Sequence, residues 1–250
     1  MIFTEFCFAQ MSTTTIDYTY RHKFDTIDKN KISKTKYRLL FDSKSMKCYN
    51  LDELNSLNSL SAMIAKQNPD SEIDFNKKIL PQSFTSLVYD NLINNYFEKV
   101  NDIFYTIERK FVYNWRLTDE KKVYMSKECQ KAIGNFKGRE YEVWFTTEIP
   151  YPIGPWKLGG LPGAILYAKD KTGDVEFEAY AVNTNYKEES LELPTQFYKV
   201  TKEKLEAIKE EYSNNLSLGL KVTSRHADGT EFTPQRKVKT KPNNPIELKE

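Results

Sequence analysis

The stretch from Pro150 to Leu166, PYPIGPWKLGGLPGAIL, constrains the fold more than any other part of the sequence. It holds four prolines and four glycines, with Trp156 in the middle. Proline fixes φ and removes a backbone donor, whereas glycine permits positive φ and close backbone approach. Strand-like segments lead in (139–149) and out (163–168). We therefore expect a rigid loop between two strands, packed against the rest of the protein and anchored by Trp156.

Most of the remaining chain alternates between apolar and polar residues, as half-buried strands do. Residues 13–24 are an example, with Tyr18, Tyr20 and His22 on one face and Asp17 and Arg21 on the other. Further strands are expected at 37–42, 46–51, 85–92, 139–149, 164–169 and 175–182, with 103–117 in two pieces around Arg109-Lys110 and 121–136 as either one long strand or two. Because short polar turns separate most of these segments, the pattern predicts an antiparallel meander rather than a parallel α/β sheet.

Two segments have helical periodicity instead. Leucines recur every three residues after Asn50, a capping residue, which predicts a short helix near residues 51–66. A second apolar stripe predicts a helix near residues 201–218, with Thr201 as its capping residue and Gly219 at its end. The predicted fold is mainly β: a curved, mostly antiparallel sheet or half-open barrel with these two helices. Residues 11–219 would form a single β-rich domain.

Both ends of the chain are expected to differ from this domain. Residues 1–10 read as the remnant of a secretory signal, although an ordinary first strand is the alternative. Residues 220–250 are polar, with seven Lys or Arg against four Asp or Glu, and predict a mobile basic tail. The tail closes with an apolar patch, residues 244–248, which would either be disordered or dock on the sheet or on a partner.

The segment GGLPGAIL resembles the signature of the GLPGLI family of exported bacterial proteins. The resemblance extends through Trp115-Arg116-Leu117, Cys129-Gln130-Lys131-Ala132 and Trp144-Phe145-Thr146-Thr147-Glu148-Ile149-Pro150 to Gly154-Pro155-Trp156-Lys157. It covers roughly residues 85–185, and Ala164 replaces the usual leucine. The resemblance implies export to the periplasm or outer cell envelope. It implies no activity, because the family has no established one.

Familiar catalytic chemistry is missing from the sequence. No zinc-ligand spacing, nucleophile elbow, P-loop or Rossmann glycine pattern occurs, so we assign no catalytic residue, metal or cofactor. A formal net charge of +2 argues against a dedicated nucleic-acid binder, and no run is long enough for a transmembrane helix. In an exported chain, Cys48 and Cys129 could form a disulfide, with two separate buried thiols as the alternative.

Aromatic and loop residues are the best binding candidates. Trp144 interrupts a polar strand face, so it is either covered by another element or part of a binding surface. With it we group four loop residues: Pro155, Trp156, Leu161 and Pro162.

These residues favour a non-enzymatic binding or accessory module for an envelope partner or a small apolar ligand. The alternative is a hydrolase that uses an unrecognised thiol or carboxylate site, for which the pairs Glu140/Glu142 and Glu176/Glu178 are candidates. Such pairs are usually the solvated face of a sheet.

Overall fold

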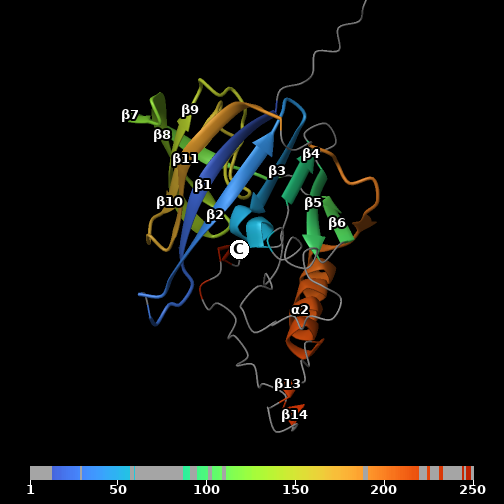
Figure 1. The fold of residues 1–250 in the computed structure, drawn as a ribbon. Coiled ribbons are helices and arrows are strands. Elements are labelled where there is room, and N and C mark those ends of the chain that lie inside the picture. Colours follow the sequence, from blue (N-terminus) through green and yellow to red (C-terminus); the bar gives the residue numbers. More distant parts are fainter. Residues whose placement is uncertain are drawn as a thin grey trace, which may run out of the picture.

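A computed structural model gives the fold shown in Figure 1. The structure describes residues 13–28, 30–56, 59, 87–90, 95–100, 103–108, 111–187, 191–219, 224–225, 231–232, 244 and 246–248. The predicted signal remnant at residues 1–10, the end of the first predicted helix and most of the tail lie outside these residues.

Twelve strands form one sheet in the order β12-β6-β5-β4-β3-β2-β1-β11-β10-β9-β8-β7. Every neighbouring pair is antiparallel except β12 and β6, which confirms the predicted mainly antiparallel sheet. The strands are β1 (Thr13–Lys23), β2 (Ile32–Phe41), β3 (Ser45–Asn50), β4 (Leu87–Asp90), β5 (Asn95–Val100), β6 (Ile103–Glu108), β7 (Asn114–Tyr124), β8 (Lys127–Phe136), β9 (Arg139–Thr146), β10 (Ala164–Asp170), β11 (Val175–Tyr186) and β12 (Tyr198–Lys199).

The sheet consists of two meanders joined side by side. Strands β1 to β6 follow one another in sequence order, and so do β7 to β11. The pairing of β1 with β11 joins them, with Ile16 opposite Val182 and Tyr20 opposite Phe177. This register buries the predicted face of β1, because Ile16, Tyr18 and Tyr20 are at most 9% exposed.

The helices begin where the capping residues predict. Asn50 Oδ1 accepts hydrogen bonds from the amides of Asp52 (3.0 Å) and Glu53 (3.2 Å) at the start of a short helix, described over residues 51–56 and 59. Helix α2 (Lys202–Gly219) begins after Thr201, whose Oγ1 accepts from the Lys204 amide at 3.2 Å. A small separate hairpin pairs β13 (Ser224–Arg225) with β14 (Glu231–Phe232). No helix among the described residues is long and apolar enough to cross a membrane.

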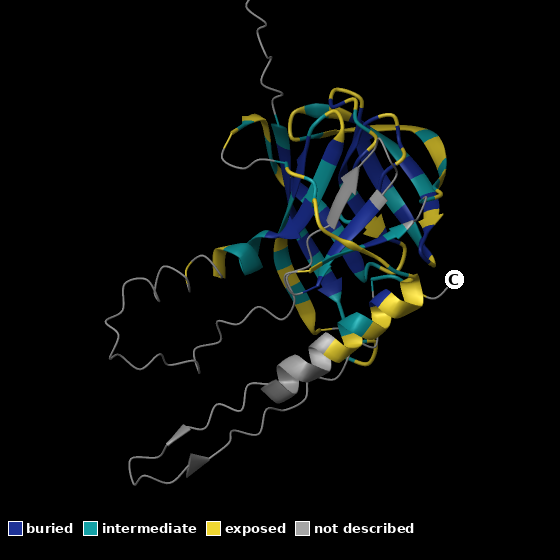
Figure 2. Cartoon of the chain, turned by 90° about the vertical axis from the view of Figure 1, so that its right-hand side faces the viewer, coloured by how far each residue is buried: buried dark blue, intermediate teal, exposed yellow. Residues whose placement is uncertain are grey.

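The proline- and glycine-rich loop between β9 and β10, which we call the central loop (residues 147–163), is part of the hydrophobic core. Ile149, Ile153, Leu158 and Leu161 are 2–5% exposed and belong to the same cluster as the buried strand residues. Figure 2 shows this core as the dark blue interior of the sheet, with helix α2 largely exposed below it.

Contacts of the central loop reach both meanders. Its Tyr151 ring lies 5.3 Å from Phe41 of β2, and its Lys157 Nζ lies 5.1 Å from the Tyr96 ring of β5. From the other side, Trp115 Nε1 of β7 donates to Gly159 O at 2.7 Å. Because β5 and β7 are far apart in the sheet order, the sheet must curve around the loop to make these contacts.

Two glycines allow this close packing. A Cβ at Gly163 would lie 2.0 Å from Thr146 O, and a Cβ at Gly160 would lie 2.4 Å from the Tyr113 ring. Gly160 also has φ +79°, in the region that favours glycine. The glycines that define this stretch in the sequence are therefore required by backbone approach and by conformation.

If the central loop is a core element, Leu161→Ala should lower the free energy of unfolding by about 2–5 kcal/mol, because it leaves a cavity in a packed interior. The neighbouring exposed Pro162 is the matched control, and Pro162→Ala should change stability by less than about 1 kcal/mol. Urea unfolding followed by tryptophan fluorescence measures both. Equal, small losses would show that the loop lies on the surface instead.

Candidate functional site

Trp144 does not form the exposed aromatic surface that was one reading of the sequence. Its side chain is only 7% exposed. Lys122 and Lys131 place their ammonium groups over the ring at 5.7 and 5.9 Å from its centroid, and Tyr124 lies 6.1 Å away. The indole Nε1 donates to Glu142 Oε1 at 3.1 Å. Neighbouring strands therefore cover this ring.

The four loop candidates are mostly interior as well. Pro155 and Leu161 are buried, Trp156 is half-buried, and Pro162 is exposed. They do not make a continuous contact surface, because the loop packs inside the sheet. Trp156 is nevertheless unusual: its φ is +58°, and its buried Nε1 has no hydrogen-bond partner among the described residues. Both features carry a free-energy cost.

Cys48 and Cys129 are separate buried thiols, so the disulfide reading is wrong for this structure. They lie on β3 and β8, with β2, β1, β11, β10 and β9 between them in the sheet. Burial raises the pKa of Cys48 to about 12 and that of Cys129 to about 11. At neutral pH both thiols are protonated, which makes them poor nucleophiles.

The carboxylate pairs on β9 and β11 are engaged in ion pairs. Glu142 contacts Lys131 at 3.1 Å, and Glu176 contacts Arg21 at 2.9 Å. Burial alone would raise the pKa of both carboxyls, but hydrogen bonds from Lys131 and Trp144 to Glu142, and from Tyr167 and Arg21 to Glu176, hold each pKa below its usual value. Among the described residues, no group of three or more His, Cys, Asp or Glu side chains is arranged to hold a metal ion.

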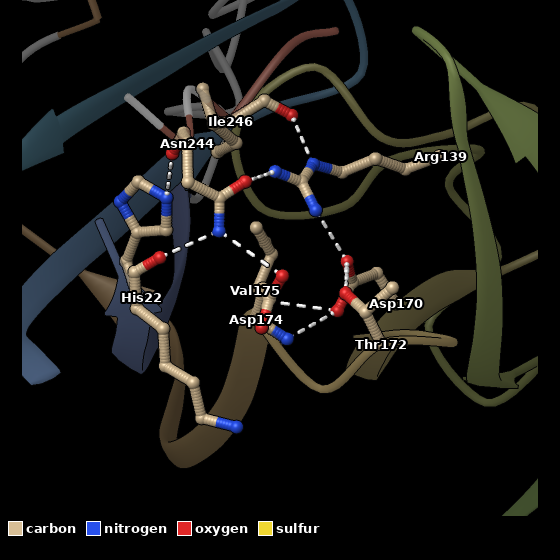
Figure 3. Close-up of polar contacts among 9 residues, drawn as sticks. His22, Arg139, Asp170, Thr172, Asp174, Val175, Asn244 and Ile246 are labelled. Carbon is tan, nitrogen blue, oxygen red and sulfur yellow. Dashed lines mark hydrogen bonds and ion pairs between the residues drawn. The ribbon is translucent and has the colours of Figure 1, made fainter. Parts of the chain in front are cut away.

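Several polar groups converge instead on the chain's own C-terminal segment, residues 244–248. Figure 3 shows Asn244 and Ile246 of this segment beside His22, Arg139 and Asp174. The sequence left two alternatives for these residues, disorder or docking, and the structure has Asn244, Ile246, Glu247 and Leu248 docked. The groups that hold them come from four parts of the fold and make up what we call the acceptor site: the side chains of His22, Arg139, Lys157 and Asp174, the main-chain carbonyl of Lys23, and Asp170, which pairs with Arg139.

Asn244 is held through both its side chain and its main chain. Its Oδ1 accepts from Arg139 Nη2 at 2.6 Å, and its Nδ2 donates to Lys23 O at 2.7 Å and to Asp174 Oδ2 at 3.1 Å. Its carbonyl oxygen pairs with His22 Nε2 at 2.7 Å, and its amide donates to Phe24 O at 3.3 Å. The residue is 6% exposed. A site that satisfies both ends of a carboxamide discriminates strongly against side chains that lack them.

A buried ion pair forms the base of the site. Arg139 Nη1 lies 2.5 Å from Asp170 Oδ2, and the two side chains are 3% and 1% exposed. The amides of Asp174 and Val175 donate to Asp170 Oδ1 at 2.7 and 3.0 Å, and Thr172 Oγ1 donates to Oδ2 at 2.7 Å. Buried charges are tolerated only when such hydrogen bonds offset the lost hydration.

The C-terminal segment supplies part of that compensation. Besides Asn244, the Ile246 carbonyl accepts from Arg139 Nε at 3.0 Å. The guanidinium group therefore binds both a protein carboxylate and two acceptors from the segment. Removing the segment would take these two acceptors away from a buried cation.

A second anchor links the segment to the central loop. Lys157 Nζ lies 2.5 Å from Glu247 Oε1, and also 4.9 Å from the Trp156 ring centroid and 5.1 Å from that of Tyr96. The Lys157 side chain is only 10% exposed, so solvent screens this pair less than a surface pair. Leu248 N donates to Lys137 O at 3.0 Å.

Sequence reasoning missed the acceptor site. It placed His22 on the aromatic face of a half-buried strand, Arg139 at the start of a strand and Asp170 in a polar turn. The available signal was the cluster Asn-Pro-Ile-Glu-Leu near the end of a polar tail, which indicated docking but not its location.

No family profile matches the chain, and no curated protein sequence matches it. Its fold is similar to solved structures of PNGF-II in two crystal forms. The TM-scores are 0.57 and 0.56 at 15% and 16% sequence identity, and the matches cover 80% of this chain but 34% and 33% of PNGF-II. The chain therefore spans about a third of the length of that protein. At this identity the similarity concerns the fold alone, and membership of the GLPGLI family stays a prediction.

The state of the cysteines can be tested directly. Cys7 lies outside the described residues, so the measurement uses a Cys7→Ser variant. At pH 8, Ellman's reagent should react with neither remaining thiol in the folded protein, because both are buried and carry raised pKa values. After unfolding in urea without reductant, both should react. Rapid reaction in the folded state would contradict the burial, and no reaction after unfolding would reveal a disulfide.

His22 should make stability depend on pH. Burial lowers its pKa below the ordinary value of 6.5, the charge of Arg139 adds to this, and the hydrogen bond to Asn244 together with Asp174 and Asp170 opposes it. The unfolded chain then binds a proton near pH 6.5 that the folded chain binds only at lower pH. The contribution of neutral His22 is therefore complete above about pH 6.5 and is lost as pH falls towards the folded pKa.

Between pH 7.5 and 5.5, the wild type should lose more unfolding free energy in urea titrations than His22→Gln, by up to about 1.4 kcal/mol per unit of pKa difference. The two proteins differ only at residue 22, so the difference between their pH profiles reports on His22. An identical pH dependence in the two proteins would show that His22 titrates as it does in the unfolded chain.

Proposed function

We propose that this chain is a non-enzymatic binding or accessory protein of the bacterial cell envelope, exported to the periplasm or outer envelope, which acts by holding a short peptide segment of an envelope protein. The observation that carries the proposal is the acceptor site. It binds the C-terminal segment through a buried asparagine, a buried ion pair and main-chain hydrogen bonds. The motif resemblance to the GLPGLI family supports the envelope location.

A small apolar ligand is the less favoured partner. The interior of the curved sheet is the place where such a ligand would bind. In this chain the central loop packs there, and its four buried aliphatic side chains belong to the core.

The hydrolase alternative finds little support in the described residues. Its two candidate thiols are buried and protonated at neutral pH. The carboxylates Glu142 and Glu176 are ion-paired with lowered pKa values, which disfavours the protonated form that a general acid needs.

The proposal can be tested by site-specific photo-crosslinking in the bacterium that produces the protein. A photoreactive residue at Lys171, exposed and next to Asp170 in sequence, should give an adduct of defined mass with an envelope protein. The same residue at Val123, which is 67% exposed on the edge strand β7, is the control and should not give that adduct. The proposal fails if the protein fractionates with the cytoplasm, or if neither position gives a specific adduct.

A further inference from the structure

We infer that the acceptor site recognises a short peptide of the pattern Asn-x-x-Glu in a partner protein, and that the chain's own C-terminal segment is a resident competitor for it. This inference rests on the proposed function, since it names the chemistry of the partner. Three properties of the site support it: two side-chain anchors at a fixed spacing, recognition of the main chain between them, and a long tether to the resident segment.

The two anchors define the pattern. Asn244 fills a site that meets both ends of its carboxamide, through Arg139, Lys23 and Asp174. Three residues later, Glu247 meets the ammonium group of Lys157 at 2.5 Å. The donors and acceptors at the first anchor favour Asn over other residue types, and the positive charge at the second anchor favours Glu.

Main-chain groups of the segment make the other hydrogen bonds. Four hydrogen bonds involve main-chain atoms of the segment: the amide and carbonyl of Asn244, the carbonyl of Ile246 and the amide of Leu248. Any peptide of suitable conformation offers these groups. Ile246 also packs against the core cluster, which favours an apolar residue before the glutamate.

The resident segment lies at the end of a long connection. Asn244 follows Gly219, the last residue of α2, by 25 positions in the sequence. Such a length can extend over about 80–90 Å. A tethered ligand of this kind has an effective concentration in the millimolar range. It raises the apparent Kd of any outside peptide by the inverse of the fraction of sites that it leaves free.

The same competition argues against a second copy as the main partner. A segment from another copy offers identical contacts at a far lower concentration than the tethered one. To displace the resident segment, a partner protein needs a segment with higher affinity for the acceptor site. Trp156 offers a hydrogen bond that the resident segment does not make. Its buried Nε1 has no hydrogen-bond partner among the described residues, and its ring lies next to Lys157, which holds Glu247. One added hydrogen bond corresponds to about two- to tenfold in affinity.

The test uses full-length protein and a fluorescent peptide with the sequence of residues 241–250. The Asn244→Ala substitution in the protein weakens the binding of the resident segment to the acceptor site but leaves the acceptor side chains intact. Fluorescence anisotropy should therefore show at least tenfold tighter peptide binding to Asn244→Ala than to the wild type. Changing Asn244 or Glu247 to Ala in the peptide should weaken binding at least tenfold, and Lys157→Ala in the Asn244→Ala protein should do the same.

The inference is overturned if the folded Asn244→Ala protein does not bind the peptide, or if the altered peptides bind equally well. Hydrogen exchange on the wild type gives a second measurement that needs no variant. The Leu248 amide should exchange much faster than the Leu205 amide, because the segment leaves without global unfolding. Exchange of both amides at the same rate would show that the segment is a permanent part of the fold and would overturn the inference.

Light scattering tests whether the segment that occupies the acceptor site comes from a second copy of the chain. The wild type should stay monomeric from micromolar to near-millimolar concentration. A dimer that Asn244→Ala abolishes would assign the segment of a second copy as the partner and overturn the partner-protein assignment. The peptide-binding measurement is independent of the crosslinking test. Peptide binding without an envelope adduct would refute the proposed function alone. An envelope adduct without peptide binding would refute only this inference.

Discussion

The packing of the central loop inside the curved sheet is the constraint on which the rest of the structure depends. A segment so rich in proline and glycine does not form a regular strand, because proline lacks the donor and glycine weakens a strand. It carries four large aliphatic side chains into the core nevertheless. The sheet buries them by curving until strands from both meanders contact the loop.

This arrangement also explains where the polar site forms. When β1 pairs with β11, the end of β1 comes beside the turn that follows β10, and the start of β9 comes beside both. Arg139, Asp170 and His22 meet there although each belongs to a different strand. A buried ion pair contributes little net stability but strongly penalises any arrangement that leaves one charge unpaired. The site is therefore better suited to selecting a ligand than to holding the fold together.

Loop and site are coupled through two consecutive residues. Trp156 has a left-handed backbone conformation and a buried N–H without a partner, and Lys157 next to it reaches Glu247. Departures from relaxed geometry persist where the surroundings impose them, and they often lie at binding sites. The sequence was thus a fair guide to the important loop. It misjudged how the loop contributes, since the loop supports the site from inside and Lys157, rather than Trp156 or Leu161, touches the bound segment.

The sequence by itself determined most of the local elements: the antiparallel strands other than β5, both helix starts, and a rigid loop that has to pack. These depend on alternation, capping residues and backbone restrictions within a few neighbouring positions, so they can be read without knowing the fold. Only the tertiary structure decided that β1 pairs with β11, that Trp144 is covered, that the two cysteines lie apart, and that residues 244–248 bind beside His22 and Arg139. Each of those facts depends on contacts between residues far apart in the chain, and such contacts are set by strand order and register, which no local pattern specifies.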